Sequence, residues 1–421
     1  MKSAAITSNP SSDPTQKQPW KLAFVFCFLV LLTDGADIGI LAFTLSSLKQ
    51  EFGLSNLQAG ALGSWSLIGM GIGGFFGGWA CDRFGRVRVM VTATALFALL
   101  SGGVGFAHNY EQFIVLRVLA CIGLGSLYIA CNTLMSEMVP TKHRTTVLAT
   151  IMTGYTLGSL VISGLSAWII PIYGWRMIYF ISFTPVILAV LMHFTLSEPQ
   201  SWKEARALKL KGLNPNIRKS ENAYKAIFEN PKHRLMFTLW TMTSTLLLFG
   251  YFGVSNWLPT YLETELGIKF KEMAIYMAGT YLTMMFAKVV AGAVADKIGR
   301  KIVFAFGTMG TALFIPVLIY FHTPENIGLL MIAFGFLYGI PYAINATYLS
   351  ESFPTAIRGT AMGGSYNIGR VGSAIAPLAI GYIAMQGSIG AGLLLMAGAY
   401  FLCGLIPTLF IKEQQYDPQK A

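Results

Sequence analysis

Asp82-Arg83-Phe84-Gly85-Arg86 and Asp296-Lys297-Ile298-Gly299-Arg300 are two versions of one short motif, and each follows a long apolar segment. The second version begins 214 residues after the first. The same offset relates a second pair of motifs, which consists of Glu137, Pro140 and Arg144 and of Glu351, Pro354 and Arg358. Because one offset relates two separate motifs, the sequence predicts two parallel copies of one structural unit.

The apolar segments around these motifs are about 20 residues long, which is the length that a helix needs to cross a bilayer. Of all residues, 54% are hydrophobic and 12% are charged, a composition that excludes an ordinary soluble chain. We therefore predict an all-α membrane protein with twelve transmembrane helices in two pseudo-symmetric six-helix halves. The predicted spans are 22–45, 58–80, 89–107, 112–135, 146–170, 177–196, 235–258, 273–295, 302–321, 327–349, 360–384 and 389–411.

A polar stretch after the sixth span divides the chain into domains. We predict a six-helix bundle at 21–196, a cytoplasmic linker at 197–234 and a second six-helix bundle at 235–411. Residues 1–20 are rich in Ser, Thr, Asn and Pro, so we expect a disordered cytoplasmic tail there and a short cytoplasmic tail at 412–421.

The positions of Lys and Arg predict how the chain is oriented in the membrane. Of the 30, three fall within predicted helices and four on segments assigned to the outer side, namely Lys49, Arg176, Lys269 and Lys271. The other 23 lie on inner segments, so both termini are predicted to be cytoplasmic in a bacterial inner membrane. The net charge of +11 is therefore a topology signal, and we expect no nucleic-acid partner.

The first predicted helix contains two carboxylates, Asp34 and Asp37, on one face of an otherwise apolar segment. A charged Asp at the bilayer centre costs about 2.5–3.5 kcal/mol, which is tolerable where that face meets water, a cation or a proton. At about 1.5 Å per residue, Asp37 and Arg117 of the fourth helix both lie ~22 Å from the inner surface. We predict that Arg117 pairs with Asp37 or Asp34 and that this pair helps to load and release a proton. A static buried ion pair is the alternative.

Two further cations, Arg370 and Lys288, occur within predicted helices of the second half, and the corresponding positions of the first half carry no charge. Arg370 lies near the midplane, and its planar guanidinium suits a carboxylate. We predict that it binds the substrate, with Tyr366 and Asn367 beside it, Lys288 as a second cation and Asn345 in the cavity wall. Neutralisation of Arg370 by a first-helix carboxylate, snorkelling of Lys288 to the inner surface and ordinary packing of Asn345 are the alternatives.

Gly69-x-Gly71-x-x-Gly74 matches the spacing of a dinucleotide-binding fingerprint. It lies inside an apolar segment with no strand before it, so we predict no nucleotide site. Small residues at this spacing, like the pair Gly73 and Gly77, favour a close approach of two membrane helices.

The longer stretches around the first motif, Gly77-Gly78-Trp79-Ala80-Cys81-Asp82-Arg83-Phe84-Gly85-Arg86-Val87-Arg88 and Gly292-Ala293-Val294-Ala295-Asp296-Lys297-Ile298-Gly299-Arg300-Lys301, resemble the loop signature of the major facilitator superfamily. The resemblance covers nearly all of the chain. Asp34-Gly35-Ala36-Asp37 is similar to the Asp-Gly-x-Asp motif of the aromatic acid:proton symporters in that superfamily, and the segments 256–262 and 369–372 also look like that family.

The resemblance implies roles for the charged loop residues and for Arg117. In the family, the loop residues form an inner gate whose charge pairs hold the outward-facing state and break when the protein switches. Anchoring by positive charge on the inner side is the alternative. The fourth-helix Arg is tied to proton transfer. The implied gate residues are Asp82, Arg83, Arg86, Glu137, Arg144, Asp296, Arg300, Glu351 and Arg358.

These observations together predict a proton-coupled symporter that imports a small organic anion by alternating access, with a benzoate-type aromatic acid as the expected substrate. Three alternatives remain: import of a non-aromatic acid or a dicarboxylate such as muconate, export by proton antiport, and ligand sensing without transport. We expect no enzymatic activity, because no catalytic Ser/His or Cys/His pair and no metal-ligand cluster is evident. We expect a monomer in the lipid bilayer that needs no cofactor besides the coupling protons.

Overall fold

Residues 20–139, 144–210 and 224–412 are described by a computed structural model. Within them, twelve spans are long and apolar enough to cross a membrane, which confirms the predicted number. Most of the two expected tails and the middle of the expected linker lie outside the described residues.

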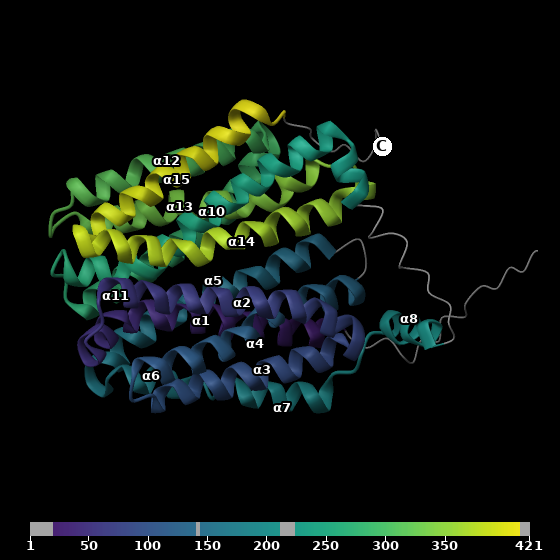
Figure 1. Ribbon diagram of the computed structural model, residues 1–421, viewed down its shortest axis with the longest axis horizontal. Helices are drawn as coiled ribbons and strands as arrows, with labels where there is room; N and C mark the ends of the chain where they lie inside the picture. The colour runs from purple at the N-terminus through teal and green to yellow at the C-terminus, as the bar shows by residue number, and fades with distance from the viewer. Residues whose placement is uncertain (1–19, 140–143, 211–223, 413–421) are drawn as a thin grey trace, which may run out of the picture.

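The first half is a bundle in which α1 packs along α5 and α2 packs along α4 (Figure 1). Side-chain caps begin several of its helices. Ser55 accepts a hydrogen bond from the backbone of Gln58 at the start of α2, and Asn109 does the same for Gln112 at the start of α4. The helices of this half are α1 (Trp20–Phe52), α2 (Asn56–Phe84), α3 (Arg86–Gly103), α4 (Tyr110–Met138), α5 (Arg144–Tyr173), α6 (Trp175–Ile181) and α7 (Pro185–Thr195).

The second half, teal through green to yellow in Figure 1, repeats this arrangement. Here α10 packs along α14 as α1 does along α5, and α11 packs along α13 as α2 does along α4. The predicted pseudo-symmetry is therefore present in the packing of the helices. The helices of this half are α10 (Pro231–Thr264), α11 (Phe270–Ile298), α12 (Arg300–Tyr320), α13 (Ile327–Glu351), α14 (Thr355–Gln386) and α15 (Ile389–Phe410).

The motif that marks the repeat folds in the same way in both halves. Gly85 and Gly299, with φ of 117° and 102°, end α2 and α11 in a conformation that other residues rarely adopt. The Arg that follows turns back onto the preceding helix. Arg86 Nη1 donates to a carbonyl of α2 at 2.8 Å, and Arg300 Nη1 donates to a carbonyl of α11 at 2.7 Å. The motif thus makes a sharp turn and caps the helix that it ends.

The sixth span, predicted over 177–196, is present at Trp175–Thr195, but its helix is interrupted. It consists of α6 and α7, which are separated at residues 182–184. Pro185 has no N–H and cannot donate to the carbonyl of Ile181. Instead, the N–H of Thr184 donates to the carbonyl of Ile181 at 2.9 Å, which makes a tighter turn. A new helix then begins at Pro185.

The first part of the linker is docked on the motif of the first half. The carboxylate of Glu198 accepts bonds from the backbone N–H groups of Arg86 at 2.7 Å and Arg88 at 2.9 Å, at the positive end of the α3 dipole. The indole of Trp202 in α8 (Gln200–Leu210) donates to the carbonyl of Asp82 at 3.1 Å. Figure 1 shows α8 beyond the end of the first bundle.

The two halves meet along three helix pairs: α2 against α14, α5 against α11, and α1 against α10. Hydrogen bonds across this interface include Asn56 Nδ2 to the carbonyl of Ala384 at 2.9 Å and Ser163 Oγ to the carbonyl of Ala274 at 2.6 Å. Asn56 starts α2, whereas the repeat motif lies at the other end of that helix. These contacts therefore hold the halves together at the end of the bundle remote from the repeat motifs.

Glycines bring α2 and α4 into backbone contact, as the small-residue interpretation of the sequence predicts. A Cβ atom on Gly73 would overlap the backbone of Ile122 in α4. A Cβ atom on Gly71 would meet nothing within 4 Å. A Cβ atom on Gly69 would also overlap the backbone of α4, at Val118, so Gly69 and Gly73 are constrained by the helix contact and Gly71 is not.

Gly73→Ala is expected to lower the free energy of unfolding by roughly 1–3 kcal/mol, because the added methyl group forces α2 away from α4. Gly71→Ala, two residues away on the same helix, is the matched control and should change stability by about 1 kcal/mol or less. Thermal unfolding of the purified protein in detergent measures both changes. Equal melting temperatures for the two variants would contradict this account of the packing.

Candidate functional site

A buried ion pair joins α1 to α4 in the first half. Arg117 Nη1 lies 2.5 Å from Asp37 Oδ2, and Arg117 Nη2 donates to the carbonyl of Asp37 at 3.0 Å. Ser101 of α3 donates its hydroxyl to the other carboxylate oxygen of Asp37. Both charged side chains are at most 2% exposed. The depth estimate from the sequence therefore identified two residues that do meet, and in this conformation each charge is compensated.

Asp34 lies three residues before Asp37 on α1 and is in a different environment. Its side chain is 1% exposed, and its Oδ1 has no hydrogen-bond partner among the described atoms. Electrostatic interactions reach Asp34 from Asp37, Arg370 and Arg117. An ionised carboxylate without a partner is costly in such surroundings, so the structure leaves Asp34 as a position for a proton or a cation.

Arg370 projects from α14 toward the first half. The central carbon of its guanidinium lies 5.8 Å from the ring centroid of Tyr128 in α4, which is within cation–π range. Within the described ranges, no carboxylate lies within 4.0 Å of it, so direct neutralisation by Asp34 or Asp37 is not found in this conformation. Tyr366, half-buried, interacts with Arg370, whereas Asn367 is exposed.

Lys288 projects from α11 toward α5. Its Nζ donates to Thr156 Oγ1 at 2.8 Å, so the side chain crosses to the first half and does not snorkel to the inner surface. No ion pair of Lys288 is found in the part of the chain that the structure describes.

Asn345 and its neighbour Tyr348 lie on α13 in the second half. Asn345 is 6% exposed, and its Oδ1 has no partner among the described groups. The ring of Tyr348 packs edge-on against Trp240 with centroids 5.0 Å apart, which makes it part of the core of this half. The side chain of Asn345 therefore has unused hydrogen-bonding capacity at Oδ1.

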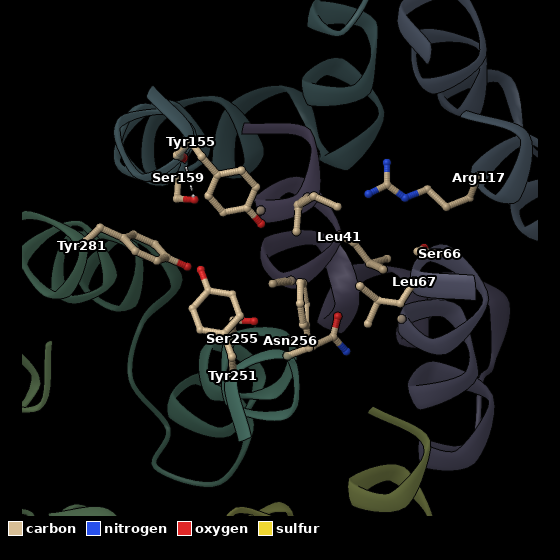
Figure 2. A pocket seen from close by; sticks show the side chains of 15 residues that line it. Leu41, Ser66, Leu67, Arg117, Tyr155, Ser159, Tyr251, Ser255, Asn256 and Tyr281 are labelled. Atoms are coloured by element: carbon tan, nitrogen blue, oxygen red, sulfur yellow. Dashed lines mark hydrogen bonds between the residues drawn. The ribbon is translucent and has the colours of Figure 1, made fainter. Parts of the chain in front are cut away.

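A cavity of about 30 Å³ lies between the halves next to the ion pair (Figure 2). Tyr155, Tyr251 and Tyr281 line one side of it and Arg117 the other. This volume has room for water but not for an organic acid.

The charged loop residues form one cluster in each half. Arg86 lies 3.0 Å from Asp82 and 2.8 Å from Glu137, and Arg300 lies 2.9 Å from Asp296 and 3.4 Å from Glu351. All of these contacts lie within one half. The gate role of these residues therefore stays a prediction.

The other three predicted gate residues are placed differently. Arg83 is exposed and stacks on Trp79 and Phe84. Arg358 Nε donates to the carbonyl of Phe353 at 3.2 Å. Arg144 begins α5, but its side chain lies outside the described part of the chain.

Sequence reasoning did not identify several hydroxyl groups of the site, namely Ser101, Tyr128, Tyr251 and Tyr281. Hydroxyl side chains are common in membrane helices, where they bond the carbonyls of their own helix, so one sequence carries no signal for them. Thr156 is different, because it occupies the position that corresponds to Arg370 in the repeat.

Comparisons with known proteins cover almost the whole chain. The family model described as the Major Facilitator Superfamily matches residues 27–284 and 264–421. A cis,cis-muconate transport protein of Acinetobacter baylyi is 54% identical over 98% of this chain and 100% of that protein. A gallate transporter of Pseudomonas putida is 29% identical, over 91% of this chain and 89% of that protein. A benzoate transport protein of Acinetobacter baylyi is 24% identical, over 90% and 87%.

The fold also matches solved structures. A crystal structure of a D-xylose-proton symporter aligns with a TM-score of 0.77 at 21% sequence identity. The alignment covers 94% of this chain and 99% of that protein. At this identity the likeness concerns the arrangement of the helices alone.

Arg117→Met is expected to destabilise the protein by about 3–5 kcal/mol, because it leaves the carboxylate of Asp37 buried without a counter-charge. The double variant Asp37→Leu/Arg117→Met removes both charges and should recover much of that loss. Melting temperatures in detergent measure both effects. If Arg117→Met had the same melting temperature as the wild type, burial of the Asp37 carboxylate would not depend on Arg117.

Proposed function

Since this chain belongs to the Major Facilitator Superfamily, we propose that it is a proton-coupled symporter that imports a small organic acid by alternating access. One observation carries the proposal: in the described part of the chain, Asp34 Oδ1 is buried without a hydrogen-bond partner, and Arg370 and Lys288 face the first half without an ion pair to a carboxylate. A proton and an organic anion are the two species that complete such a set of charges.

The substrate that we propose first is cis,cis-muconate or a close relative of it. This choice is supported by the muconate transport protein, which is 54% identical over 98% of the chain. The benzoate-type acid favoured by the sequence alone becomes the second candidate. It is supported by the benzoate and gallate transporters, at 24% and 29% identity.

Asp34 is the residue that we propose to carry the proton. The charge of Asp37 is already compensated by Arg117, whereas burial without a partner favours the neutral acid at Asp34. Loss of this proton on the inner side would create a negative charge that attracts Arg370. The ionised carboxylate would then compete with the bound anion for Arg370, so proton release would promote substrate release.

We propose that the protein lies in the inner membrane as a monomer with both termini cytoplasmic, and that it needs no cofactor besides protons. The distribution of Lys and Arg supports this orientation. The contacts of Asn56 and Ser163 then lie on the outer side, so the described conformation is closed to the outside. The two loop clusters then lie at the inner side, and we propose that they come together across the halves when that side closes.

Uptake into proteoliposomes tests the proposed function. Labelled cis,cis-muconate is expected to accumulate when the outside is one pH unit more acidic, by roughly tenfold for each coupled proton. A protonophore should abolish accumulation but not equilibration. Glu111→Gln, which changes an exposed acid in the first turn of α4, is the control and should behave as wild type. If accumulation did not depend on the pH gradient, proton coupling would be contradicted. If neither muconate nor benzoate were taken up, the proposed substrate class would be contradicted.

Asp34→Asn is expected to separate exchange from accumulation. The amide has nearly the size of the neutral acid but cannot release a proton, so exchange of internal for external muconate should persist. Accumulation driven by the pH gradient should fall to the equilibration level. Measuring both fluxes in the same vesicles checks this, and a variant that accumulates muconate as well as wild type would exclude Asp34 as the proton carrier.

A further inference from the structure

Lys288 and Arg370 contact the first half at positions that the internal repeat relates to each other. Lys288 Nζ donates to Thr156 Oγ1 of α5 at 2.8 Å. Arg370 Nη1 lies 3.3 Å from the position that a Cβ atom on Gly74 of α2 would occupy. Shifting Lys288 back by 214 residues gives Gly74, and shifting Arg370 back gives Thr156. Each cation therefore contacts the residue that corresponds to the other cation.

This relation sets the depth of the two cations. Two halves of parallel topology are related by a pseudo-twofold axis along the membrane normal. The axis exchanges the Arg370–Gly74 contact with the Lys288–Thr156 contact, because it exchanges the halves. The two contacts thus lie at the same depth on opposite sides of the axis, one where α2 meets α14 and one where α5 meets α11.

The charge at this depth is positive, and within the described ranges no carboxylate forms an ion pair with it. Arg117 is compensated by Asp37. Neither Arg370 nor Lys288 has a carboxylate within 4.0 Å in the described ranges. With a proton on Asp34, the two cations carry a net charge of two. One monoanion leaves half of that charge uncompensated in the membrane, whereas one dianion neutralises it.

We propose that Arg370 and Lys288 form a single dicarboxylate site, in which each cation binds one end of a linear substrate that lies across the pseudo-twofold axis. The inference rests on the proposed function and narrows its substrate class to dicarboxylates. The guanidinium offers paired N–H donors to one carboxylate, and the ammonium binds the other as a compact charge. Gly74 leaves room for the guanidinium, and Thr156 holds the ammonium on its side of the axis.

Two ligands that differ in one charge test the site directly. Isothermal titration of the purified protein in detergent compares cis,cis-muconate with its monomethyl ester, which keeps the carbon chain and removes one carboxylate charge. The wild type is expected to bind the diacid at least tenfold more tightly than the ester, because only the diacid reaches both cations.

Four variants assign this preference to residues. Lys288→Gln can still bond Thr156, and it is expected to weaken diacid binding at least tenfold while changing ester binding less than about threefold. Arg370→Gln should also bring the two affinities within about threefold of each other. Lys288→Arg keeps the charge and should keep the preference. Lys232→Gln, which changes an exposed lysine at the start of α10, is the control and should match wild type.

The outcomes separate this inference from the proposed function. Equal affinities of the wild type for diacid and ester would overturn the dicarboxylate site and leave organic acid transport standing. If Lys288→Gln weakened the binding of diacid and ester equally, Lys288 would act only through packing, and its role as a carboxylate ligand would be overturned. A folded wild type that binds neither ligand would overturn the proposed substrate and, with it, this inference.

Discussion

A charge that enters the hydrocarbon core without a partner is costly, and this constraint accounts for where the chain carries charge. Most Lys and Arg residues lie outside the predicted spans, where water is available. Of the charges that lie within the spans, Asp37 and Arg117 neutralise each other. Asp34, Arg370 and Lys288 have no such compensation in the described chain, and their free energy therefore depends on what the protein binds.

The two halves repeat the scaffold but not these charges. The turn at Gly85 and Arg86 recurs at Gly299 and Arg300 with the same backbone conformation and the same Arg contacts. In each half this turn ends one membrane helix and leads directly into the next, so both halves need it. The centre has no such requirement, and there a glycine and a threonine in one half correspond to cations in the other.

Much of the fold and part of the site follow from the sequence. The number of spans, the internal repeat and the close approach at Gly73 follow from hydropathy and spacing, and the structure agrees with each. The contact between Asp37 and Arg117 was predicted from their estimated depths in the membrane. The rise per residue gives the depth of each residue along its helix, and residues of equal depth on adjacent helices can meet. The break before Pro185 was not predicted, because an apolar segment keeps its hydropathy whether or not the helix is continuous.

That this chain is a membrane protein of two related halves follows from its sequence, because the bilayer imposes length and polarity on every span regardless of its neighbours. The sequence also shows which residues carry charge at the midplane. Which of those charges are compensated depends on the packing of the helices, since two neighbouring carboxylates on one helix differ solely in what packs against them. The contacts of Lys288 with Thr156 and of Arg370 with Gly74 likewise follow from the tertiary structure, because contacts between helices depend on the packing of the two halves and not on position along the chain.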